Sequence, residues 1–140
     1  MRIEWATICK EIRETETGWD LLGVNQDTAL VIGDLPTEIV IPLAVCIAAR
    51  FDELGQEGNA HEVRCVVVGP DLSKVAANTE RIRLEAPAGS HYEGWEGRLI
   101  LPFAVAVPVT EGTFSFDVSA DDSEAISLPY AMRLAPPMPE

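Results

Sequence analysis

Apolar and polar residues alternate toward the C-terminal end of the chain. Phe114, Phe116 and Val118 are separated by polar residues, and residues two apart in an extended strand share a face. This pattern predicts a half-buried strand. The segment from Ile126 to Leu134 alternates in the same way. Because Pro129 in that segment has no backbone N–H, we expect the second strand to lie at a sheet edge or beside a bulge.

Three other segments are apolar at almost every position, namely Ile39–Ala49, Val63–Val68 and Leu99–Val107. Strands that are covered on both faces read this way, so we expect these segments in the middle of packed sheets. The turn sequence Gly69-Pro70-Asp71-Leu72-Ser73 predicts a hairpin after the second segment. Ser73–Thr79 contains a candidate helical turn of marginal length.

Three further strands are expected near the N-terminus. One passes through Trp5 and Cys9, one runs from Trp19 to Val24 after a turn at Thr17-Gly18, and one begins near Thr28. The chain thus has about eight strands, frequent Gly and Pro, and no segment with a convincing amphipathic helical period. These features indicate an all-β fold.

The strand count favours a two-layer antiparallel sandwich of immunoglobulin-like or C2-like type, with a closed barrel as the alternative. We expect one domain over residues 1–134, which includes a long polar loop at Glu85–Gly97. Residues 135–140, with the sequence Ala-Pro-Pro-Met-Pro-Glu, are expected to form a flexible Pro-rich tail because their prolines cannot continue a strand ladder.

Composition and charge exclude several kinds of partner. The 140 residues include 23 Asp and Glu against 10 Lys and Arg, which gives a formal net charge of −13. Binding to polyanions needs clustered cations, so nucleic acid and anionic membrane surfaces are not expected as partners. The apolar fraction of 47% is close to that of ordinary globular domains.

The chain shows no signal for export or membrane insertion. Its first residues lack the basic and long apolar segments of a secretory signal, so we expect a cytoplasmic protein. Ile39–Ala49 is interrupted by Pro42 and is too short for a membrane span, which needs roughly 20 residues. The three cysteines have neither zinc-type spacing nor an even count, and we expect reduced, buried thiols.

The order of several short motifs resembles a family of small bacterial proteins known only as a domain of unknown function. In sequence order the motifs are Ala6-Thr7-Ile8-Cys9, Leu22-Gly23-Val24, Leu35-Pro36, His61-Glu62-Val63, Gly69-Pro70-Asp71 and Pro108-Val109-Thr110-Glu111-Gly112-Thr113-Phe114. The resemblance spans most of the chain and implies a single-domain β-sandwich. It implies no activity, cofactor or catalytic residue.

Two of the apolar segments also predict a contact surface. If their larger residues face the core, the residues between them face outward, and these are small and apolar: Pro42, Ala44, Ala48, Ala104 and Ala106. If the two strands are neighbours, they form a flat uncharged patch typical of protein contacts. The patch predicts a protein partner or self-association, for example as a homodimer. The alternative is that loops or the tail cover it.

The polar loop contains a second candidate contact group. His91, Tyr92 and Trp95 lie within six residues, and aromatic side chains dominate interface hot spots. The alternative is that the loop folds back over an open end of the sandwich as structural cover.

An acidic group near the last two strands suggests the alternative function, a C2-like domain that binds calcium or a small ligand. Asp117, Asp121, Asp122 and Glu124 could gather around calcium, as carboxylates do in the loops of C2-like domains. The EF-hand spacing is absent, and a solvated acidic turn is the alternative.

Enzymatic readings have less support in the sequence. His61 and Cys65 share a strand face but are about 13 Å apart at roughly 3.3 Å per residue, too far for a catalytic dyad. Hydrolase, phosphate-binding and zinc-protease motifs are absent. We therefore expect a non-enzymatic accessory, adaptor or structural module without a cofactor, acting in the cytoplasm or in a larger assembly such as a phage particle.

Overall fold

The computed structural model describes residues 1–32, 40–51, 60–83, 97–121 and 124–135. Within these ranges the predicted all-β fold is confirmed, because the regular structure consists of ten strands. In chain order the strands are β1 (Arg2–Cys9), β2 (Glu11–Thr15), β3 (Gly18–Leu22), β4 (Thr28–Ile32), β5 (Val40–Phe51), β6 (Ala60–Val68), β7 (Lys74–Arg83), β8 (Gly97–Pro108), β9 (Gly112–Ala120) and β10 (Ile126–Ala135).

The strands form three sheets. A three-stranded sheet has the order β1-β5-β8, a five-stranded sheet has the order β4-β10-β9-β6-β7, and β2 pairs with β3 alone. All pairings are antiparallel except that of β10 with β4, which is parallel. Among the described strands each of the two larger sheets keeps two edge strands, so these strands do not close into a barrel.

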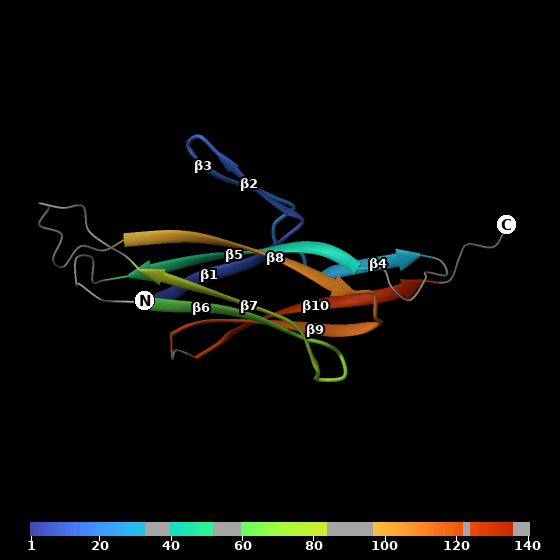
Figure 1. The fold of residues 1–140 in the computed structure, drawn as a ribbon. Coiled ribbons are helices and arrows are strands. Elements are labelled where there is room, and N and C mark those ends of the chain that lie inside the picture. The colour runs from blue at the N-terminus through green and yellow to red at the C-terminus, as the bar shows by residue number, and fades with distance from the viewer. Residues whose placement is uncertain (33–39, 52–59, 84–96, 122–123, 136–140) are drawn as a thin grey trace, which may run out of the picture.

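The two larger sheets pack face to face around one apolar core (Figure 1). Val45 and Ile47 of β5 and Phe114 and Phe116 of β9 have no exposed surface. The Phe116 ring lies 5.9 Å from that of Tyr130 on the neighbouring strand β10. Because each fully buried large apolar side chain contributes about 1.5 to 3 kcal/mol, this shared layer is the main source of stability.

The structure corrects several details that were predicted from the sequence. Ser73–Thr79 contains no helical turn, because β7 begins at Lys74 and continues the hairpin with β6. Leu99–Val107 lies in β8, which is an edge strand and not a central one. The strand number exceeds eight because the chain leaves the three-stranded sheet at Lys10 and forms the separate β2–β3 pair.

Prolines in the strands lie where no ladder hydrogen bond is needed. The carbonyl group of Ala104 in β8 points away from β5, because its oxygen accepts a 2.8 Å hydrogen bond from the Asn78 side chain. Backbone groups of residues two apart in a strand point the same way, so the backbone of Pro102 also points away from β5. Pro42 lies beyond Ala44, the last β5 residue that pairs with β1. Pro129 precedes the stretch of β10 that pairs with β4. The prediction that its strand lies at a sheet edge or beside a bulge is wrong, because β10 lies between β4 and β9 and its pairing with both is regular.

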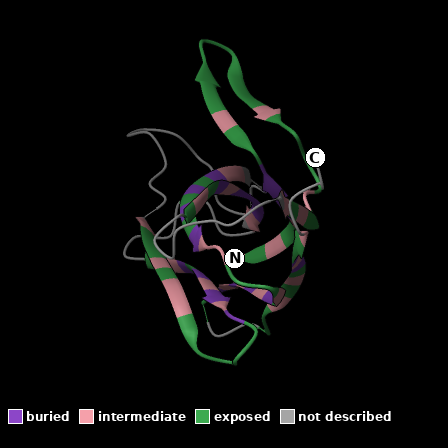
Figure 2. Ribbon diagram, turned by 90° about the vertical axis from the view of Figure 1, so that its right-hand side faces the viewer, coloured by how far each residue is buried: buried purple, intermediate pink, exposed green. Residues whose placement is uncertain are grey.

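The β2–β3 hairpin stands away from the two packed sheets (Figure 1). Figure 2 shows it as a mostly exposed arm that rises from the body formed by the larger sheets. Every residue from Arg13 to Asp20 is exposed. The hairpin therefore takes no part in the shared core.

Candidate protein-contact surface

The outer face of the three-stranded sheet is the face turned away from the five-stranded sheet. β5 and β8 are neighbours, as the contact prediction required, and Pro42 lies opposite Ala106 while Ala44 lies opposite Ala104. Pro42, Ala104 and Ala106 are exposed and Ala44 is half-buried. We define the outer patch as the exposed apolar residues of this face: Trp5, Val40, Pro42, Pro102, Ala104 and Ala106.

Three members of the outer patch, Trp5, Val40 and Pro102, were not among the predicted contact residues. Trp5 of β1 is 43% exposed and Val40 at the start of β5 is 51% exposed. The sequence pattern placed Trp5 on one face of its strand, but only the pairing of β1 with β5 shows that this face adjoins the outer face of β5.

One predicted contact residue is covered within the chain itself. Ala48 belongs to the outer face by register but is only 7% exposed. It lies directly opposite Trp5 in the β1–β5 ladder, and the large indole next to a small methyl group accounts for its burial. The exposed apolar residue at this position is therefore Trp5 and not Ala48.

Two cysteines lie beneath the same face. Cys46 lies opposite Thr7, and Cys9 opposite Ala44, and both thiols are fully buried. Burial, together with the neighbouring Cys9, raises the pKa of the Cys46 thiol to about 11. Burial also raises the pKa of Cys9. Both groups are thus neutral thiols at neutral pH, and they are unsuited to nucleophilic chemistry.

The third cysteine belongs to the core between the sheets. Cys65 is 1% exposed and free, as are the other two. Burial and the charge of Asp117 raise the pKa of its thiol to about 11. The expected buried position of the three cysteines is confirmed.

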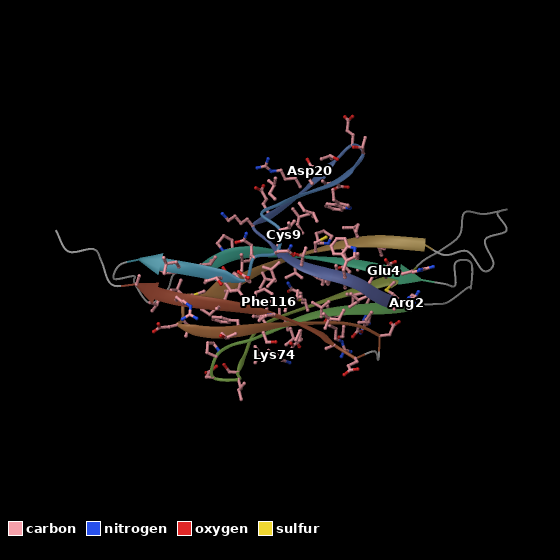
Figure 3. The ribbon with its side chains drawn as sticks, turned by 180° about the vertical axis from the view of Figure 1, so that it is seen from behind. Arg2, Glu4, Cys9, Asp20, Lys74 and Phe116 are labelled. Carbon is pink, nitrogen blue, oxygen red and sulfur yellow. The ribbon has the colours of Figure 1, made fainter. Side chains whose placement is uncertain are left out.

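Basic residues occupy one end of the outer face. Arg2 of β1 lies opposite Arg50 of β5, and Arg98 of β8 lies opposite Arg50 on the other side. Figure 3 shows Arg2 and Glu4 at this end of β1. This end of the sheet therefore holds these arginines and the Glu4 carboxylate, and Glu4 and Arg50 each have an interaction partner.

Both faces of the projecting hairpin carry charged side chains, because Glu14 lies opposite Trp19 on the face that holds Ile12 and Leu21. Ile12 lies opposite Leu21, and Trp19, two residues from Leu21, lies on the same face. Ile12 and Leu21 are half-buried and Trp19 is 37% exposed. On the opposite face the Arg13 guanidinium donates two hydrogen bonds, of 2.8 and 3.0 Å, to the Glu11 carboxylate. These bonds lower the pKa of Glu11.

The base of the hairpin is fixed by backbone contacts. The Lys10 N–H donates to the carbonyls of Leu22 and Gly23 at 3.0 and 3.3 Å, and the Gln26 N–H donates to Ile8 at 2.9 Å. Gly23 has a φ of +63°, and a Cβ there would lie 2.9 Å from the Lys10 side chain, so the close approach requires glycine. These contacts hold the hairpin at its angle to the sheet.

The residues of the predicted aromatic contact loop, His91, Tyr92 and Trp95, lie outside the described residues. Their role stays a prediction.

The acidic residues proposed for calcium lie at separate points. Asp117 accepts hydrogen bonds from Ser115 and Ser127 at 2.6 and 2.7 Å. Asp121 follows four residues later, which corresponds to roughly 13 Å along an extended strand. Glu124 is exposed, and Asp122 lies outside the described residues. Within the described residues no three His, Cys, Asp or Glu side chains gather as a metal site would require.

Asp121 is instead tied to β6. Its carboxylate oxygens accept from the His61 ring at 2.8 Å and from the Glu62 N–H at 3.0 Å, and its own N–H donates to the Glu62 carbonyl at 2.7 Å. Burial raises the pKa of this carboxyl, but these hydrogen bonds and the nearby positive charges outweigh burial, so the pKa lies below 3.8. The arrangement is a polar clamp between the end of β9 and the start of β6.

A pocket of about 180 Å³ lies between β1 and β10. It is lined mainly by apolar and amide groups, including Ile8, Asn25 and Leu128, and Asp27 is its one titratable residue. His61 does not line it.

No protein-family model matches this chain, and no curated protein matches it either. In the described part of the chain, no helix is both long and apolar enough to cross a membrane.

Proposed function

We propose that this chain is a non-enzymatic module that associates with protein, and first of all with a second copy of itself, through the outer patch. We further propose that its two packed sheets belong to the sandwich folds of immunoglobulin-like or C2-like type. Membership of the resembled family of small bacterial proteins, and action in the cytoplasm, stay predictions.

One observation carries the proposal. The outward positions of β5 from Val40 to Ala48, and those of β8 from Ile100 to Pro108, include no charged side chain. A surface free of charge is unusual on a chain with 23 acidic residues, where like charges keep copies apart. Depletion of charge and the presence of a large aromatic residue, here Trp5, are characteristic of the centre of a protein interface.

Sedimentation velocity on the full chain at about 1 to 100 μM tests the proposal, because contacts of moderate affinity dissociate in this range. We expect a monomer–dimer equilibrium in the wild type. Ala104→Glu places a charge at an exposed position of the outer patch and should shift the chain to monomer. Ala77→Glu introduces the same change at an exposed position on β7 and serves as the matched control, which should sediment as wild type.

A wild-type chain that stays monomeric over the whole range would overturn the proposal. So would an Ala104→Glu variant that associates as strongly as the Ala77→Glu control. Thermal unfolding of both variants checks that neither substitution disrupts the fold.

A further inference from the structure

The pocket between β1 and β10 reaches the shared core. Its inner wall is apolar, because Ile8 of β1 belongs to the core and Ala6 of β1 and Leu128 of β10 pack against it. Its volume of about 180 Å³ is smaller than the roughly 300 to 1,000 Å³ of sites for drug-sized ligands. A group about as large as one short side chain therefore fits.

One short segment forms the polar rim of the pocket. The chain passes from the three-stranded sheet to the five-stranded sheet through this segment, where Asn25 has a left-handed φ of +58°. The Gln26 N–H donates to the Ile8 carbonyl at 2.9 Å, and the Asp27 carbonyl accepts from the Ala131 N–H at 2.8 Å. Because the rim is bonded to both sheets, the pocket is formed before any ligand arrives.

The rim offers hydrogen-bond acceptors beside a single donor group of Asn25. Backbone groups of residues two apart in a strand point the same way, so the Pro129 carbonyl faces the side on which Ala131 bonds Asp27. Pro129 has no N–H of its own. The Asn25 side-chain oxygen already accepts from the Thr7 hydroxyl at 3.1 Å, which leaves its amide nitrogen as a donor.

Asp27 gives the pocket its charge. The residue is exposed, and its carboxylate has no hydrogen bond or ion pair within the described part of the chain. Lys10, whose side chain lies beside Gly23, does not pair with it. The carboxylate repels an anion, and none of the lining residues is basic. An ammonium group has three N–H donors, which can bond both the carboxylate and the Pro129 carbonyl.

We propose that this pocket binds a short alkylammonium group. The carbon chain of the ligand lies against Ala6 and Leu128, and its ammonium group bonds Asp27 and the Pro129 carbonyl. A free small amine and the lysine side chain of another protein both carry this chemistry. The pocket shares no residue with the outer patch, so this inference is independent of the proposed association.

Titration of the full chain with n-butylamine at neutral pH, followed by amide NMR, tests the proposal. We expect saturable shifts at Ala6, Ile8 and Leu128, with a dissociation constant in the millimolar range because so small a ligand has few atoms to contact the protein. The uncharged n-butanol should bind at least about threefold more weakly, since it lacks the ion pair. Asp27→Asn should remove this difference between the two ligands. Asp20→Asn removes another exposed carboxylate and, as the matched control, should bind both ligands as wild type does.

The two sources of the ammonium group are distinguished with a capped Gly-Lys-Gly peptide. Shifts of the same amides by the peptide assign the site to a lysine side chain, whereas shifts by n-butylamine alone assign it to a free amine. Equal binding of n-butylamine and n-butanol to the wild type contradicts the proposal. So does an equal loss of n-butylamine binding in both Asn variants, or an absence of saturable shifts at the three amides. Thermal unfolding checks that both variants are folded.

Discussion

The body formed by the two larger sheets and the β2–β3 hairpin are built from the same kind of strand, yet they obtain stability differently. In the body, residues such as Phe114 and Phe116 of β9 are completely buried against the opposite sheet. In the hairpin, the largest side chain, Trp19, keeps 37% of its surface exposed. The difference shows that strand pairing positions side chains, while a second layer is what turns their apolar area into stability.

The largest expected difference in the free energy of unfolding is between Phe116→Ala in the body and Trp19→Ser in the hairpin. Phe116→Ala leaves a cavity beside Tyr130 and should lower the free energy of unfolding by about 3 to 5 kcal/mol. Trp19→Ser should lower it by under about 1 kcal/mol, because a marginal hairpin can open without unfolding the body. Urea denaturation at a protein concentration low enough to keep the chain monomeric measures both values.

Equal losses in the two variants would contradict the comparison. They would mean that the hairpin unfolds together with the body as one cooperative unit.

The polar clamp at Asp121 in the body and the exposed Glu11–Arg13 pair in the hairpin allow a second comparison of the stability of the two regions. Asp121→Asn keeps a side chain that tolerates the local φ of +51° but removes the charge that His61 contacts. Since this carboxylate is 36% exposed, solvent screening limits the expected loss to about 0.5 to 1 kcal/mol at neutral pH. Glu11→Gln should change the stability too little to measure.

The effect of Asp121→Asn depends on pH in a definite direction. The pKa of Asp121 lies below its ordinary value of 3.8 in the folded chain, so its contribution is complete above that value. The contribution is lost as pH falls from 3.8 through the lowered pKa. The stabilities of wild type and variant should therefore converge as the pH falls through the lowered pKa. A constant difference down to pH 2 would show that the charge of Asp121 is not what stabilises the clamp.

Alternation along the chain was sufficient to predict the strands that have one buried face, such as β9. The period-two pattern of Phe114, Phe116 and Val118 reports a strand with one buried face, and that signal lies in consecutive residues. The parallel pairing of β4 with β10 could not be predicted in this way, because Leu30 and Arg133 become neighbours only through contacts far apart in sequence. The alternation of apolar and polar residues shows which face of a strand is buried, but it does not show which strands pair with it.

The same limit applies to the candidate surface. The small apolar residues Pro42 and Ala104 could be assigned to an outward face because their strands alternate. The role of Trp5 depends on the pairing of β1 with Ala48, and the projection of the hairpin depends on the contacts of Lys10. Both features depend on contacts between segments far apart in the sequence, so they could not be predicted before the pairing of the strands was known.

The turns of the hairpin and of the body differ in which residue each contains, and this difference predicts the smallest change in stability. The hairpin turn contains Gly18, whereas the body turn between β6 and β7 has Leu72 at a φ of +68° with 86% of its surface exposed. A left-handed backbone costs leucine about 1 kcal/mol more than residues that tolerate it, such as Asn. The turn itself is held elsewhere, since Asp71 accepts a 2.6 Å hydrogen bond from the Ser73 hydroxyl and the Leu72 N–H donates to Gly69 at 2.9 Å.

Leu72→Asn should therefore raise the free energy of unfolding by about 0.5 kcal/mol, measured by urea denaturation of the monomer. Leu72→Ala removes the same exposed side chain without relieving the backbone, and it should leave the stability nearly unchanged. If Leu72→Asn instead destabilises the chain, the leucine contributes to the packing of the body despite its exposure. In that case the packing contacts of the body would extend to a turn that is otherwise held by its own hydrogen bonds.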